Sequence, residues 1–75
     1  MDSEQIRFRR FIRNKTTGQY LRLDGSWTPH LEEACEFKNA LAMLDCCHVF
    51  GLMRGIQVLI KPYVPTMPEV IADLF

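Results

Sequence analysis

Hydrophobic and polar residues alternate in two stretches near the start of the chain, and this pattern predicts a β-hairpin. Residues 6–13 alternate until two adjacent arginines break the phase, which indicates a strand that carries a bulge or begins late. Residues 14–18 form a turn ending in Gly18, which is free to take the left-handed conformation, and residues 19–23 alternate cleanly. We therefore expect two antiparallel strands joined by a short loop.

The length of that loop determines which hairpin residues share a face. With residues 15–18 in the loop, Arg13 lies opposite Tyr20 and Ile12 lies opposite Leu21. The face that we expect in the core then consists of Ile12, Leu21 and Leu23. The other face, rich in aromatic and arginine side chains, consists of Phe11, Arg13, Tyr20 and Arg22.

The middle of the chain carries start and stop signals for helices. Thr28, followed by a proline and two glutamates, suits an N-cap and predicts a short helix over residues 29–36. A longer helix is predicted from Ala40 to Phe50, capped by Asn39 and ended by a glycine. Because apolar residues surround it almost completely, this helix should be covered on two sides.

The last third of the sequence predicts a strand followed by a helix. Residues 56–61 alternate cleanly, with Leu59 on the side opposite the isoleucines and valine, and prolines follow. Residues 66–69 then match a capping box with a proline in the first turn. The helix that we expect to begin there places four apolar residues on one side: Val70, Ile71, Leu74 and Phe75.

These elements predict a single α+β domain of 75 residues. Residues 1–5 are expected to form a flexible N-terminus. Residues 6–61 form a β-β-α-β core, in which one main helix packs on one face of a three-stranded, mainly antiparallel sheet. Residues 62–75 form a proline-containing linker and a short C-terminal helix, which is the candidate to cover the second side of the main helix.

The apolar content of the chain predicts self-association. Hydrophobic residues make up 48% of the sequence, whereas a domain of this size buries only about 60% of its unfolded surface. We therefore expect a homodimer or higher homo-oligomer, acting as a non-enzymatic protein–protein interaction module. Its second apolar surface is predicted to consist of Phe11, Tyr20, Leu59, Val70, Ile71, Leu74 and Phe75.

Charge is uneven along the chain and suggests a different kind of partner. The net charge is zero, but residues 1–22 are basic and residues 23–75 are acidic. The basic part interleaves phenylalanine and tyrosine with arginine, a composition that suits base stacking and phosphate binding. A nucleic-acid-binding module is therefore the alternative hypothesis, less favoured because the pI is about 6.7. Its candidate residues are six basic ones, Arg7, Arg9, Arg10, Arg13, Lys15 and Arg22, with the interleaved aromatic residues Phe8, Phe11 and Tyr20.

Residues that carry chemistry are present but poorly spaced for catalysis. Cys46 and Cys47 are adjacent in the predicted helix, where neighbours point about 100° apart and do not reach one metal ion together. Their apolar surroundings, and the glutamates around Cys35, should raise the thiol pKa values. We predict no enzyme activity, no metal and no cofactor. Trp27 is a candidate interaction residue that lines a pocket or covers the core.

The sequence also predicts where the protein resides. No apolar stretch reaches the roughly 18 residues needed for a membrane span, and residues 1–5 lack the basic-then-apolar layout of a signal peptide. Three cysteines are an odd number, which argues against a disulfide framework. We expect a cytoplasmic protein with reduced thiols.

Three short motifs carry a resemblance to a known group of proteins. They are T-G-x-Y-L at residues 17–21, G-x-W-T at residues 25–28 and A-x-x-F at residues 34–37, followed by an alanine-containing helix and an I-x-V-x-I strand. Over roughly residues 10–61 the chain resembles small uncharacterised bacterial proteins of β-β-α-β type. The resemblance implies the fold and brings no activity with it.

Overall fold

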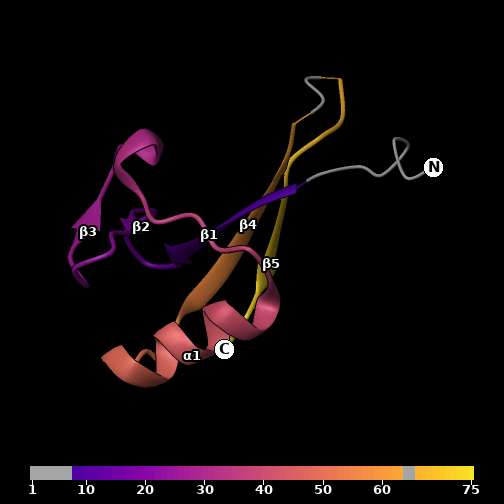
Figure 1. Cartoon of the computed structure of the whole chain (residues 1–75). Coiled ribbons are helices and arrows are strands. Elements are labelled where there is room, and N and C mark those ends of the chain that lie inside the picture. Colours follow the sequence, from indigo (N-terminus) through magenta and orange to yellow (C-terminus); the bar gives the residue numbers. More distant parts are fainter. Residues whose placement is uncertain (1–7, 64–65) are drawn as a thin grey trace.

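The α+β class is confirmed, but the sheet has five strands rather than three. The computed structural model describes residues 8–63 and 66–75, so the expected flexible segment 1–5 lies outside the described residues. The strands are antiparallel and lie in the spatial order β3-β2-β1-β4-β5, with a helix below them in Figure 1. Along the chain the elements are β1 (Phe8–Asn14), β2 (Tyr20–Leu21), β3 (Trp27–Thr28), the 3-10 helix η2 (Leu31–Glu33), α1 (Ala40–Phe50), β4 (Ile56–Pro62) and β5 (Val70–Asp73).

The centre of the sheet is the ladder between β1 and β4, which is continuous along both strands, so β1 contains no bulge. Phe11 faces Leu59 on one side of the sheet, and Ile12 faces Val58 on the other. Phe11 and Ile12 are both fully buried. A strand buried on both faces does not alternate between apolar and polar residues, which explains the loss of phase in the sequence.

The start of the hairpin follows the prediction. Arg13 pairs with Tyr20, and Gly18 has a φ of 75°. The side chain of Asn14 accepts hydrogen bonds from the backbone N–H groups of Thr16 at 2.8 Å and Thr17 at 3.1 Å, and so holds the turn. The register and the turn chemistry were therefore both readable from the sequence.

Beyond this pair, β1 and β2 separate, and a later segment fills the space between them. The N–H of Cys35 donates to the carbonyl oxygen of Leu21 at 2.9 Å, and the N–H of Phe37 donates to that of Arg10 at 2.8 Å. Because β2 ends at Leu21, Leu23 is 81% exposed. Its predicted place in the core was wrong.

Helix α1 has the predicted boundaries. The side chain of Asn39 accepts from the N–H of Ala42 at 2.9 Å, and Gly51 is left-handed with a φ of 67°. The N–H of Leu52 donates to the carbonyl oxygen of Cys47 at 2.8 Å, the bond that closes a Schellman motif. The helix packs its buried residues into a core cluster with the sheet: Ile12, Leu21, Phe37, Met43, Cys47 and Ile56.

The helix predicted over residues 66–75 was wrong, because residues Val70–Asp73 form strand β5 beside β4. The capping box is a local signal, and an isolated helix of about ten residues is marginal in water. Without β5, one side of the β4 backbone would lack hydrogen-bond partners. Two β-branched residues, Val70 and Ile71, also favour a strand. Sheet pairing therefore overrides the local signal.

The helix predicted over residues 29–36 shrinks to one 3-10 turn, Leu31–Glu33. Thr28 belongs to β3, where it pairs with Tyr20, so a helix does not begin there. Its buried hydroxyl donates to Glu33 Oε1 at 2.8 Å and accepts from the N–H of His30 at 3.1 Å. Thr28 thus ties the turn to the sheet.

Candidate interaction surface

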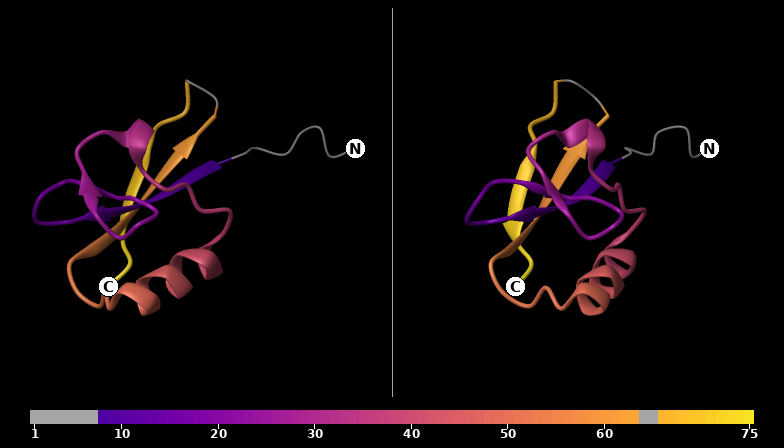
Figure 2. Two further views of the ribbon diagram at one scale, coloured as in Figure 1. Left: turned by 60° about the vertical axis from the view of Figure 1, so that its left-hand side comes forward. Right: turned by 90° about the vertical axis from the view of Figure 1, so that its left-hand side faces the viewer.

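Strand β5 forms one outer margin of the sheet, and its backbone leaves hydrogen-bonding groups free there. Figure 2 shows β5 (yellow) beside β4, with the C-terminus close to α1. The N–H of Leu74 donates to the carbonyl oxygen of Ile56 at 2.8 Å. Because antiparallel bonding alternates along a strand, Val70 and Ala72 also bond toward β4. Ile71 and Asp73 therefore direct their N–H and C=O groups toward the open side.

The side chains of β5 are exposed on both faces of the sheet. Val70 and Ala72 lie on the face that carries α1, opposite Ile60 and Val58, and Ile71 lies on the other face. Val70 and Ile71 are each 50% exposed, although both are large and apolar. When one face of an edge strand is packed, only every second side chain contacts solvent. Strand β5 therefore exposes more apolar surface than such a strand usually does.

Two carboxylates flank the apolar residues of β5, and each is already engaged by β4. Lys61 Nζ lies 2.8 Å from Glu69 Oε2, and Gln57 Nε2 donates to Asp73 Oδ1 at 3.3 Å. Both carboxylates share the sheet face of Ile71. A carboxylate therefore lies at each end of a short apolar segment, and the ion pair with Lys61 compensates the charge of Glu69 but not that of Asp73.

The structure places the predicted surface residues in three different environments. Val70, Ile71 and Phe75 are exposed, whereas Leu74 is partly buried and packs on the core. Phe11 and Leu59 are 0% and 2% exposed, so the prediction that they form an open apolar surface was wrong. They face each other on the side of the sheet opposite α1, where the guanidinium of Arg9 lies 5.1 Å from the centre of the Phe11 ring.

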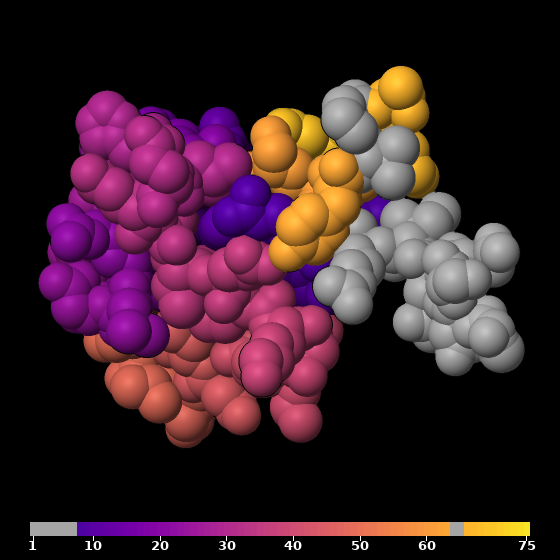
Figure 3. Space-filling view, turned by 45° about the horizontal axis from the view of Figure 1, so that its top comes forward, coloured from indigo at the N-terminus to yellow at the C-terminus, as the bar shows by residue number. Residues whose placement is uncertain are grey.

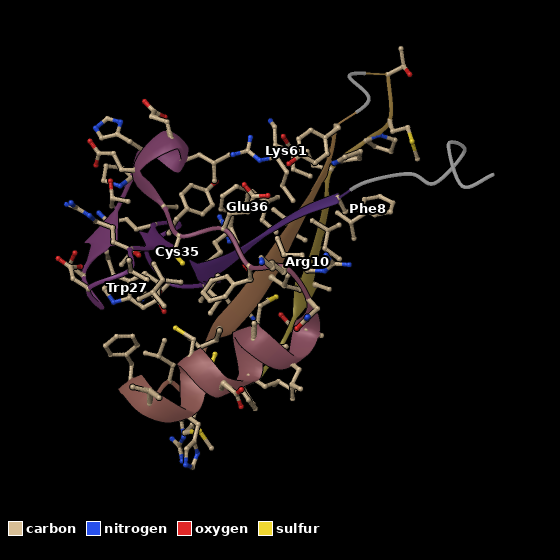
Figure 4. All side chains as sticks on the ribbon, viewed as in Figure 1. Phe8, Arg10, Trp27, Cys35, Glu36 and Lys61 are labelled. Atoms are coloured by element: carbon tan, nitrogen blue, oxygen red, sulfur yellow. The ribbon has the colours of Figure 1, made fainter. Side chains whose placement is uncertain are left out.

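The arginines of β1 have partners within the chain. Arg9 Nε lies 3.1 Å from Glu36 Oε1, and Arg10 Nη1 donates to the carbonyl oxygen of Lys38 at 3.0 Å, just before α1 (Figure 4). Arg13 Nη1 donates to Gln57 Oε1. Since Arg9 and Arg10 point to opposite faces of β1, the arginines do not form one continuous patch.

The remaining hairpin residues lie apart from β5. Tyr20 is half-buried opposite Arg13, and Arg22 is exposed beside a shallow surface depression. That depression is lined by Arg22, Leu23, Asp24 and Glu33, and Trp27 is not among its lining residues. Trp27 instead packs against the core cluster. The predicted interaction residues of the hairpin and of the last strand therefore do not form one site.

The outward side of α1 carries exposed apolar residues that the C-terminal segment does not cover. They are Leu41, Leu44 and Val49, whereas Phe50 lies against the turn at Gly25. Residues 66–75 were expected to cover this side of α1, but Val70–Asp73 lie at the sheet edge instead. Strand β1, in contrast, has neighbours on both sides: Figure 3 shows it (indigo) between the segment after β3 (magenta to pink) and the end of β4 (orange).

The surroundings of the three cysteines raise the pKa of each thiol, as the sequence predicts. Burial raises the pKa of Cys46 and Cys47, and burial together with the nearby Glu36 carboxylate raises the pKa of Cys35. All three are free cysteines, and at neutral pH they stay protonated and weakly nucleophilic. Within residues 8–63 and 66–75, no group of three or more His, Cys, Asp or Glu residues is placed to hold a metal ion.

No helix in the described part of the chain combines the length and the apolar character needed to cross a bilayer. Comparisons of the chain with protein-family models, with curated proteins and with solved structures find no match.

Proposed function

We propose that this protein is a non-enzymatic interaction module that associates with itself, and that the edge of the sheet at β5 is the contact. The observation that carries the proposal is the exposure of β5: Val70 and Ile71 remain 50% exposed on opposite faces of an edge strand. Natural proteins usually protect such edges, because unpaired strands recruit other chains. An edge strand with two exposed, large apolar side chains is suited to recruit a second copy.

The energies of the contact predict weak association. Covering the exposed halves of Val70 and Ile71 in two copies contributes roughly 3–6 kcal/mol, and new backbone hydrogen bonds add to it. Association costs about 4–15 kcal/mol in lost freedom of motion. The favourable and unfavourable contributions are similar in size, so we expect a weak dimer that forms at high protein concentration.

The test is a charge placed on the open edge. Ile71→Glu introduces a negative charge beside the carboxylates of Glu69 and Asp73, and this charge must lose its hydration if a second copy covers β5. Val49→Glu is the matched control, because Val49 is 75% exposed and lies on α1, away from the sheet edge. We expect light scattering at high protein concentration to show a dimer for the wild type and for Val49→Glu, and a monomer for Ile71→Glu.

Two results would contradict the proposal. The first is a wild-type protein that has the mass of one chain at the highest concentration reached. The second is a dimer that survives Ile71→Glu and dissociates with Val49→Glu, because the contact would then lie on α1.

Nucleic-acid binding through the hairpin stays the alternative hypothesis. The hydrogen bonds of Arg9, Arg10 and Arg13 within the chain favour self-association over it, because an engaged guanidinium must exchange a partner to bind phosphate. If nucleic acid binds, reversing the charge of these three residues should abolish salt-dependent retention in a gel shift. Absence of retention of RNA or DNA by the wild type at low salt rejects this alternative.

A further inference from the structure

We propose that two copies join β5 to β5 in an antiparallel register centred on Ala72, so that two five-stranded sheets become one continuous sheet. The inference rests on the proposed self-association and specifies its geometry. Ala72 of one copy then faces Ala72 of the second copy across a two-fold axis perpendicular to the sheet. The partner is thus a second copy of this chain, recognised through backbone and side chains together.

Symmetry restricts the possible registers. In a continuous sheet, residues that face each other across two antiparallel strands point to the same face. Two identical strands meet this condition when the axis passes through a residue position. Of these registers, those centred on Ile71 and on Ala72 overlap three residues of the four-residue strand, and the others overlap fewer.

Charge selects between these two registers. Centring on Ile71 places Asp73 of each copy directly opposite Glu69 of the other copy. Like charges directly opposite each other on a strand pair are destabilising, and this register contains two such pairs. Centring on Ala72 places Asp73 opposite Ile71, so that no carboxylate of these residues faces another. The acidic residues at the edge therefore favour the register centred on Ala72 over the register centred on Ile71, even with Lys61 paired to Glu69.

Backbone and side-chain positions also agree with centring on Ala72. Ile71 and Asp73 carry the outward-directed N–H and C=O groups, and in this register they bond to each other. On the face that carries α1, Val70 of one copy meets Leu74 of the other. Between these apolar pairs the two Ala72 methyl groups meet, and their small size lets the strands approach.

A pair of cysteine variants tests the register. In the proposed dimer, the two copies of residue 72 form a non-hydrogen-bonded pair with Cα atoms about 4.5 Å apart, which suits a disulfide. The two copies of residue 71 are offset by two positions and lie beyond the roughly 7 Å limit for bridging. Mild oxidation should therefore link Ala72→Cys into a covalent dimer and leave Ile71→Cys unlinked.

The native cysteines do not obscure this result. Trypsin cleaves after Arg54 and does not cleave between Lys61 and Pro62, so residues 55–75 form one peptide without a native cysteine. The disulfide-linked form of this peptide, detected by mass spectrometry, reports the introduced thiol alone. The wild type, oxidised in the same way, shows any background from Cys35 or Cys46.

Each outcome bears on a different statement. Linkage of Ala72→Cys without Ile71→Cys supports the register, and the reverse overturns it in favour of the register centred on Ile71. A dimeric wild type whose two variants both stay unlinked overturns edge pairing while self-association stands. A monomeric wild type overturns both proposals.

Discussion

The two edges of the sheet are built differently, although both end an antiparallel sheet. At one edge, β3 has two residues and is followed at once by Pro29, which has no N–H to offer. Thr28 is buried there and ties the edge to η2 through its hydroxyl. At the other edge, β5 has four residues, all exposed, and two of them are large and apolar.

The difference shows where the chain uses its own segments to complete the fold. In the half of the sheet that ends at β3, residues 35–37 return to fill the space between β1 and β2 and donate hydrogen bonds to both strands, so the same chain completes this half. Beside β5, no described segment plays that role. We therefore expect variants in the half that ends at β3 to change stability, and variants at the open edge to change association.

The largest effect on stability is expected at Leu21, the fully buried residue of β2. Leu21→Ala removes core contacts and should lower the free energy of unfolding by about 2–5 kcal/mol. Leu23→Ala, two residues away and 81% exposed, should stay within about 0.5 kcal/mol of the wild type. Urea unfolding at one fixed protein concentration measures both. Equal losses for the two variants would show that β2 is not enclosed as the structure describes.

A smaller effect is expected at Gly25, in the turn between β2 and β3. Gly25 has a φ of 91°, and an added Cβ would lie 2.6 Å from Phe50 Cε1, so the turn packs closely on the end of α1. Gly25→Ala should cost about 2 kcal/mol from backbone strain and this contact. Gly55→Ala is the control, since Gly55 also has a positive φ but has open space around it. Gly55→Ala should lower the free energy of unfolding by about 1 kcal/mol, from backbone strain alone. The difference between the melting temperatures of the two variants then measures the contribution of the contact with Phe50.

The smallest effect on stability is expected from acid pH, through Asp24 in the same turn. Hydrogen bonds from the hydroxyl and the N–H of Ser26 lower the pKa of Asp24 in the folded protein. A carboxyl whose pKa is lower in the folded state stabilises the protein above its unfolded pKa, and this contribution is lost as the pH falls through the folded pKa. Asp24→Asn should therefore narrow the difference between urea midpoints measured near pH 6 and about pH 3. An unchanged difference would show that Asp24 contributes nothing to the turn.

Features that depend on neighbouring residues were predicted well from the sequence. The hairpin register at Arg13 and Tyr20 and the cap of α1 at Asn39 both follow from short-range hydrogen bonds. The candidate interaction surface was predicted only in part. Val70 and Ile71 were named, but as members of a helix, and Ala72 and Asp73 acquired significance only once they were seen in an edge strand.

What the sequence alone determined is the α+β class, the start of the hairpin and the extent of α1, because turns and caps are satisfied within a few residues. Only the tertiary structure decided that residues 70–73 form a strand, that Phe11 is buried and that Leu23 is exposed. Each of these depends on a partner distant in the chain: β4 for β5, and residues 35–37 for the space between β1 and β2. The free energy gained when backbone groups pair with such distant segments exceeds the local preference for a helix or a strand. This gain does not depend on neighbouring residues, so the local sequence pattern does not predict it.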